Sequence, residues 1–365
     1  MKTQTRTTVF SPGTDAVSEY HILITVTDPS LPYTGQQDAV LAACREASEG
    51  RTVHFRRFFL SDAANQASLL QDALSSLPLT PTSLVQQAPL DGTRIALWMY
   101  ATSPMDGPDG IPSHSGYSHH WTGSLVAPGA DSRDQMDGIF ARYEASLAEK
   151  GLRIADDAVR TWIFVRDVDT NYAGVVTGRR EFFGRIGLTP STHFLASTGI
   201  EGRHPDARSI VEMDAYAVGG LQDGQVRFLY ARDHLSPTYD YGVTFERGTA
   251  VTYGDRRHVF ISGTASIDAK GRVMHVGDAA AQAGRMLENV SALLSEADSG
   301  LRDVAMAIVY LRDPADFPVV RRIVSDALGD RPVLFVQASV CRPSWLVEME
   351  CIALTGAADP SFPVF

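Results

Sequence analysis

Residues 331–354, RPVLFVQASVCRPSWLVEMECIAL, decide the fold, because two apolar runs flank a turn and the second run carries a pair of acidic residues. The pattern predicts two β-strands joined by a short turn at residues 342–344. Alternate residues of a strand share a face, so Glu348 and Glu350 point the same way and their apolar neighbours can be core. A carboxylate in such a strand costs free energy unless it is paired, exposed or used.

The acidic strand occurs twice in the chain. Residues 211–214 (VEMD) resemble residues 347–350 (VEME), and residues 162–167 (WIFVRD) resemble residues 308–313 (IVYLRD). Both matches occur in the same order, and each copy also contains two segments with helical periodicity, which are residues 135–150, 172–186, 279–297 and 316–328. Such self-similarity indicates duplicated structural units.

The repeat predicts an α+β protein with two tandem similar units that pack pseudo-symmetrically. Each unit has a mixed sheet covered on one face by two helices. We expect one unit in residues 1–220, with additional N-terminal elements, and the other in residues 221–365. In the second unit, alternation predicts strands over residues 241–247 and 258–267. Because clefts form readily between packed units, we expect the site at the seam.

Composition narrows the functional class. The formal charge of −11 argues against nucleic acid as a partner. Three cysteines without Cys/His ligand spacing predict reduced thiols and no metal. No apolar segment is long enough to span a membrane or to serve as a leader, so we expect a cytoplasmic protein.

The second copy resembles the YjgF/Rid family. The resemblance rests on Tyr241-Gly242, on residues 259–264 (VFISGT) and on the closing strand at residues 347–350. Imine-hydrolysing members of that family carry an arginine near the position of Phe335, and this chain has none there. The resemblance therefore implies the fold more strongly than it implies imine hydrolysis.

The whole chain resembles the chorismatases, which are built from degenerate copies of that fold. The matching segments span roughly residues 94–354 and include residues 159–162 (VRTW), 196–203 (ASTGIEGR), 240–247 (DYGVTFER), 261–267 (ISGTASI) and 340–348 (VCRPSWLVE). The resemblance implies an enzyme without a cofactor that cleaves the enol ether of chorismate and releases pyruvate. Glu348 would protonate the enolpyruvyl methylene carbon, a step that suits a carboxylic acid with a raised pKa.

Two positions resemble the branch of that family that forms 3-hydroxybenzoate, namely Cys341 and Gly263. We therefore expect 3-hydroxybenzoate, with 4-hydroxybenzoate left open as a second product. The substrate is a dicarboxylate, which arginine forks bind well. The residues that the resemblance implies for substrate binding are Arg160, Arg203, Tyr241, Arg247, Gly263 and Thr264.

Other readings stay open from the sequence alone. Each arginine could form a structural ion pair, Glu350 could support Glu348, and Cys341 could be a small core residue. The alternative functions are hydrolysis of chorismate to a dihydroxycyclohexadiene carboxylate, imine or enamine deamination, and non-catalytic binding of a metabolite. Because Rid subunits form trimers, both a monomer and a homotrimer are open.

Overall fold

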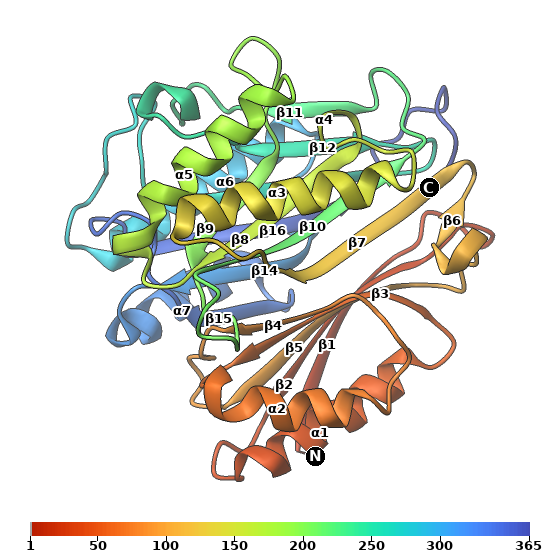
Figure 1. Cartoon of the computed structure of the whole chain (residues 1–365). Coiled ribbons are helices and arrows are strands. Elements are labelled where there is room, and N and C mark those ends of the chain that lie inside the picture. The colour runs from red at the N-terminus through yellow and green to blue at the C-terminus, as the bar shows by residue number, and fades with distance from the viewer. Residues whose placement is uncertain (1) are drawn as a thin grey trace.

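The computed structural model describes residues 2–365, except the side chains of Asp109 and Tyr241, and its three β-sheets each carry helices on one face (Figure 1). The first sheet has five strands in the order β1-β2-β5-β3-β4. The elements of this first unit are β1 (Thr3–Phe10), β2 (Glu19–Val26), α1 (Tyr33–Ser48), β3 (Thr52–Leu60), α2 (Ala63–Leu74), β4 (Thr82–Gln86) and β5 (Ile95–Thr102).

The second unit has a sheet of strand order β6-β7-β10-β8-β9. Helices α3 and α5 lie across one face of this sheet (Figure 1). The elements are η1 (Pro108–Gly110), β6 (Ser113–His114), β7 (Tyr117–Leu125), α3 (Ser132–Ala148), α4 (Ile154–Asp157), β8 (Ala158–Val165), α5 (Val168–Arg185), β9 (Ala196–Glu201) and β10 (Val211–Gly219).

The third unit has six strands in the order β11-β12-β13-β16-β14-β15. Its helix α6 buries apolar residues three and four positions apart, and the Asp278 side chain caps its first turn. The elements are β11 (Val226–Leu229), η2 (Thr238–Tyr241), β12 (Gly248–Thr252), β13 (Arg257–Ala265), α6 (Ala279–Glu296), η3 (Leu301–Asp303), β14 (Val304–Leu311), η4 (Pro314–Asp316), α7 (Phe317–Leu328), β15 (Val333–Gln337) and β16 (Val347–Thr355).

All three units share one topology. In each sheet the last strand along the chain lies in the middle, antiparallel to both neighbours, and an outer pair is parallel: β3 with β4, β8 with β9, and β14 with β15. The predicted tandem α+β architecture is confirmed, and residues 3–102 add a third unit ahead of the two that the repeat predicts. The predicted division of the chain near residue 220 stays a prediction.

The central strand of the first unit carries no acidic residue, which explains why the sequence repeat does not extend to that unit. Ala96, Glu212 and Glu348 each lie four residues before the position at which a bulge shifts the pairing of their central strand. These three residues are therefore structurally equivalent. The first unit has an alanine where the other two have glutamate, so the most distinctive part of the repeat is missing there.

The sheets turn their helix-free faces toward one another, and aromatic side chains from the first two units fill part of the space between them. Trp121 stacks on Tyr216 and Phe55, with ring centroids 4.4 Å and 4.9 Å apart. Trp98 and Trp162 lie against it at 6.3 Å and 6.0 Å. This common core fixes the relative positions of the units, and so fixes the seams between them.

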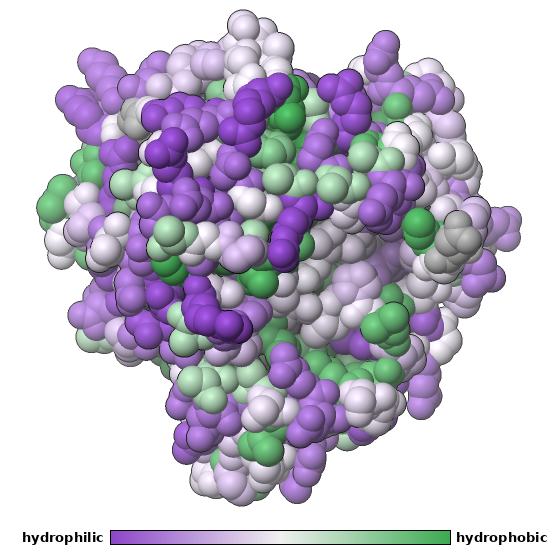
Figure 2. Space-filling model, viewed as in Figure 1, coloured by the Kyte–Doolittle hydropathy of each residue, from purple (hydrophilic) through white to green (hydrophobic). Residues whose placement is uncertain are grey.

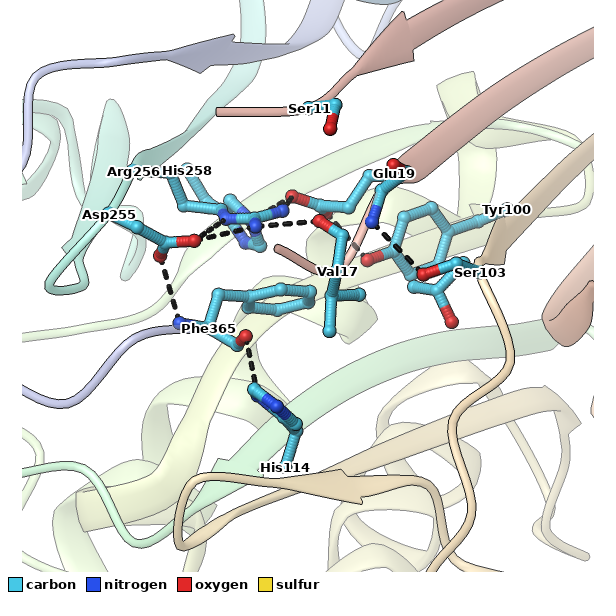
Figure 3. Close-up of polar contacts among 12 residues, drawn as sticks. Ser11, Val17, Glu19, Tyr100, Ser103, His114, Asp255, Arg256, His258 and Phe365 are labelled. Atoms are coloured by element: carbon cyan, nitrogen blue, oxygen red, sulfur yellow. Dashed lines mark hydrogen bonds and ion pairs between the residues drawn. The ribbon is translucent and has the colours of Figure 1, made fainter. Parts of the chain in front are cut away.

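A buried charged network ties the first unit to the third (Figure 3). The Glu19 carboxylate accepts hydrogen bonds from Arg256, His258 and Tyr100 at 2.7, 2.9 and 2.7 Å. Burial alone would raise the pKa of Glu19, but His258 and Arg256 outweigh it and hold that pKa well below its usual range. The backbone N–H of Phe365 donates to Asp255, so the end of the chain is fastened to the same network.

Two local predictions are wrong. The connection after β15 is longer than a turn and spans residues 338–346, and β14 lies between β15 and β16. Residues 241–247 do not form a strand, because the ladder of β12 begins at Gly248. Within the part of the chain that the structure describes, no helix has the length and apolar character needed to cross a membrane.

Candidate active site

A cavity with about 500 Å³ of empty space, open solvent included, lies at the seam between the second and third units. Helix α5 and strand β9 supply its wall from the second unit. The third unit supplies β13, the segment between η2 and β12, and the connection into β16. The lining residues include one carboxylate and three arginines, which are Glu348, Arg179, Arg247 and Arg342.

Glu348 projects from β16 into this cavity and is only 4% exposed. Its strand neighbours are Ala265 and Tyr310. Burial, reinforced by the negative charge of Glu350, raises the pKa of Glu348 to about 8, while Arg247 and Arg160 oppose the shift. At neutral pH this carboxyl group is therefore mostly protonated and can donate a proton.

Gly263 makes room for that carboxyl group. A Cβ atom at this position would lie 2.3 Å from Oε1 of Glu348 and 3.0 Å from Cγ2 of Thr198. The Gly263 N–H donates to the Thr198 hydroxyl at 2.9 Å, which holds the bulged part of β13 against β9. Glycine is therefore needed here for close approach, and not for a left-handed backbone.

At the seam between the first and second units, the space equivalent to the candidate active site is filled by a side chain. Ser124 occupies the place of Gly263, since each directly precedes the residue that pairs with a methionine of the central strand. Its hydroxyl donates to Oε1 of Glu212 at 2.5 Å. Glu212, the counterpart of Glu348, is 1% exposed and hydrogen-bonded to Ser124, whereas Glu348 lines the cavity described above.

Glu350 and Arg160 form an ion pair beneath the cavity. Nη2 of Arg160 donates to Glu350 at 2.8 Å and to the Thr198 hydroxyl at 2.5 Å. Trp162 donates its indole N–H to the same carboxylate at 2.8 Å. Arg160, predicted to bind substrate, therefore pairs with Glu350 and does not line the cavity.

Three arginines surround the empty space. Arg247, predicted from the sequence, is 4% exposed and donates to the Ser236 carbonyl at 3.0 Å. Arg179 reaches in from α5 and donates to the Thr244 hydroxyl at 3.1 Å. Arg342 lies over the ring of Trp345, with its guanidinium carbon 5.1 Å from the ring centroid. The three can balance two carboxylates and one negative charge that develops during a reaction.

Sequence reasoning did not select Arg179 or Arg342. Arg342 adjoins Cys341 in the matching segment, so its place in the sequence was enough to predict that it lines the site. Arg179 lies within the predicted helix over residues 172–186, and nothing in the periodicity marks it as functional. Its burial, 1% exposed, is what distinguishes it, and that is a property of the folded chain.

The other predicted residues have different placements. Cys341 lines the cavity, and burial raises the pKa of its thiol to about 12, so it is neutral at pH 7. Thr264 is fully buried, and its hydroxyl donates to the Ser262 carbonyl at 2.8 Å. Arg203 does not reach the cavity, because its side chain is 46% exposed and pairs with Asp167 at 2.7 Å. The side chain of Tyr241 lies outside the described residues.

The chemistry of the lining residues is that of an acid in an anion pocket. Val243, Phe245, Ala265, Ile267 and Trp345 supply apolar walls between the charged groups. Among the described residues, no group of three or more His, Cys, Asp or Glu side chains is arranged to hold a metal ion.

The third unit is similar in sequence to known proteins. The model of the family described as endoribonuclease L-PSP matches residues 248–355. The 3-aminoacrylate deaminase RutC of Acinetobacter baylyi is 36% identical over 97 residues, which are 26% of this chain and 77% of that protein.

Comparison of structures extends the likeness beyond one unit. A solved structure of a chorismatase aligns with a TM-score of 0.65 at 19% sequence identity, and the alignment covers 83% of this chain and 93% of the other. At this identity the likeness concerns the fold. The chain therefore has the chorismatase fold over most of its length and belongs to the endoribonuclease L-PSP family, the YjgF/Rid proteins.

Proposed function

We propose that this protein is a chorismatase that cleaves the enol ether of chorismate to pyruvate and 3-hydroxybenzoate, with Glu348 as the proton donor. The observation that carries the proposal is a buried carboxyl group with a raised pKa facing a cavity that three arginines line. The fold of the chorismatase neighbour supports the same reading.

The proposed reaction begins when Glu348 transfers its proton to the terminal methylene carbon of the enolpyruvyl group. The neighbouring carbon becomes an oxocarbenium ion, and the Glu348 carboxylate left behind lies close to it and stabilises it. The ring hydroxyl then attacks the ring carbon that bears the ether oxygen, the bond from that carbon to the ether oxygen breaks to release pyruvate, and the hydroxyl proton passes to the Glu348 carboxylate, which leaves an arene oxide. When the arene oxide opens, its oxygen gains a proton and the ring loses one, which gives the aromatic hydroxybenzoate, so no water is consumed.

Two cavity residues favour the internal route over hydrolysis. The Cys341 thiol is small and neutral, and it offers water a much weaker hydrogen-bonding partner than an amide would. Gly263 has no side chain to hold a water molecule beside Glu348. Hydrolysis to the dihydroxycyclohexadiene carboxylate would need such a water, so these two residues support 3-hydroxybenzoate.

Incubation with chorismate tests the proposal. Pyruvate release is followed by coupling to lactate dehydrogenase, and chromatography identifies the second product. We expect pyruvate and 3-hydroxybenzoate in equal amounts. Absence of pyruvate above background would refute the chorismatase function, whereas pyruvate with the dihydrodiol would refute only the internal route.

Deamination of an imine or enamine is the second candidate, because the relative from Acinetobacter is a 3-aminoacrylate deaminase. Strand β15, VLFVQ, carries no arginine, although imine-hydrolysing relatives have one near Phe335. The geometry therefore favours this candidate less. Ammonia release from 3-aminoacrylate above the spontaneous rate, with no pyruvate from chorismate, would establish it instead.

A further inference from the structure

A second cavity lies between the first and second units, on a different seam from Glu348. It has about 1160 Å³ of empty space, against about 500 Å³ for the candidate active site, open solvent included in both. The start of β3, the segment before β4, strand β7 and the C-terminal end of α3 form its walls. In Figure 2, apolar residues reach the surface along the boundary between the first unit, at the bottom, and the units above it.

The charge of this cavity is one-sided. Arg51, Arg56 and Lys150 line it, and none of the described lining residues is acidic. The chain as a whole has 43 acidic and 32 basic side chains, so an acid-free lining is the reverse of the general trend. The local potential therefore favours an anion despite the net charge of −11.

Buried polar groups at this cavity lack partners. Arg56 is 2% exposed; its Nη1 donates to the Pro78 carbonyl at 3.1 Å and its guanidinium also hydrogen-bonds the Cys44 thiol, but Nε and Nη2 have no nitrogen or oxygen partner among the described residues. Burial raises the pKa of the nearby Cys44 thiol, which leaves that group neutral. The indole nitrogen of Trp121 is also without a partner there. Unsatisfied buried donors are rare and call for an explanation.

Two histidines add neutral hydrogen-bonding groups. Burial lowers the pKa of His54 to about 4 and that of His119 well below its usual range. One ring nitrogen of each is bonded, to Thr102 and Tyr216 at 2.8 Å, and the other has no partner among the described residues. At neutral pH these rings can accept or donate a hydrogen bond without adding charge.

The rest of the lining mixes hydroxyl side chains with apolar ones, and the apolar ones include Val53, Leu79, Ile111 and Leu147. A small polar anion would leave this surface uncovered. A ligand that fits has an anionic group for the arginines and a flat apolar body for the remaining walls.

We propose that this cavity is a second ligand site, which binds a small aromatic carboxylate. The carboxylate pairs with Arg56, whose fork is suited to it, and Lys150 adds charge at the rim. The ring packs on the apolar wall beside Trp121. The described lining residues include no carboxyl group comparable to Glu348, and the proposal is limited to binding.

Calorimetric titration of the full-length protein with benzoate, benzamide and acetate tests the site. We expect benzoate to bind at least about tenfold more tightly than either of the others, because only benzoate has both the charge and the ring. If benzamide binds as tightly as benzoate, the site does not require a negative charge. If acetate binds as tightly as benzoate, the site does not require an aromatic ring. No benzoate binding would overturn the site itself.

Substitutions then locate the ligand. Arg56→Gln should weaken benzoate binding at least about tenfold and Lys150→Gln at least about threefold. Arg56 is buried, and its substitution could unfold the protein. Lys150 is exposed, so the benzoate affinity of Lys150→Gln tests the site without that risk. Arg142→Gln removes an exposed cation from α3, the helix that ends two residues before Lys150, and should leave the affinity unchanged.

Arg342→Gln distinguishes the two cavities. If benzoate occupies the candidate active site instead, this variant will lose binding and Lys150→Gln will not, and that result would contradict the second site. Neither readout needs turnover, so failure of the second site and failure of the chorismatase function are separate outcomes.

Discussion

At the scale of single residues, the site depends on a glycine beside a glutamate. The same fold unit places Ser124 against Glu212 and Gly263 against Glu348; the first carboxyl group is bonded to the serine, and the second faces the cavity of the candidate active site. Alternation along the strand identifies both acids, but it cannot tell which one is open. That distinction depends on residues more than 80 positions away in the sequence, which only folding brings into contact.

A pH profile tests the protonation state of Glu348. The donor must carry its proton, and burial raises its pKa to about 8, so activity should be lost as pH rises through that value. We expect kcat/KM to be level near neutral pH and to fall about tenfold per pH unit above the pKa of about 8. A profile that stays flat to about pH 10, in an enzyme that remains folded, would exclude this role.

Gly263→Ala tests the space around the carboxyl group. The new Cβ would meet the end of the Glu348 side chain, which can move away at little cost to stability. Pyruvate release should fall by about 10- to 100-fold while the melting temperature changes by only a few degrees. Gly284→Ala is the matched control, since a Cβ there meets nothing within 4 Å and turnover should not change. Wild-type activity in Gly263→Ala would show that the Glu348 carboxyl group does not need the space that this glycine leaves.

Long-range contacts also explain which predicted residues stand apart from the cavity. Arg160 faces the interior, as strand alternation requires, but its nearest carboxylate is Glu350 of the third unit. Arg203 follows β9 and pairs locally with Asp167. Motif position alone cannot separate an arginine that binds substrate from one that completes an ion pair.

At the scale of elements, irregular segments form the walls of the site. Residues 241–247 alternate apolar and polar side chains as a strand would, yet Val243 and Phe245 line the cavity and the Glu246 carboxylate accepts the N–H of Phe194. Helices and central strands were predictable because their apolar periodicity reports burial against a sheet. Residues 241–247 alternate in the same way because their apolar side chains line the cavity, so the sequence pattern was wrongly read as a strand.

Arg342→Gln tests the connection between β15 and β16. Arg342 lines the cavity. It belongs to residues 338–346, which form a longer connection than the short turn predicted from the sequence. Its charge should contribute to substrate binding more than to the chemical step, so KM should rise about tenfold or more with kcat reduced less than about threefold. Arg322→Gln, an exposed arginine of α7, should leave both parameters unchanged. A selective loss of kcat would indicate a role in the transition state.

At the scale of the whole molecule, three similar units within one chain create three seams that are not equivalent. Their central strands carry Ala96, Glu212 and Glu348 at corresponding positions. A ring of identical subunits would have three identical seams. In the single chain, Glu348 faces a cavity at one seam, Ser124 fills the space beside Glu212 at another, and the third position carries no acid.

Glu212→Gln tests that asymmetry. Glu212 is as buried as Glu348, and burial raises its pKa as well, but the Ser124 hydroxyl caps it away from any substrate. Pyruvate release by this variant should stay within about threefold of wild type, even if its melting temperature changes. A loss as large as that expected for Glu348 would mean that the two seams share the reaction.

The most direct test of the central claim is the rate of pyruvate release from chorismate by Glu348→Gln. The amide cannot donate the proton, so kcat should fall by about 10² to 10⁴. The variant should fold at least as stably as wild type at pH 8, because ionisation of the buried carboxyl group, with its pKa raised to about 8, opposes folding as pH rises. A folded Glu348→Gln protein that releases pyruvate at the wild-type rate would contradict the account.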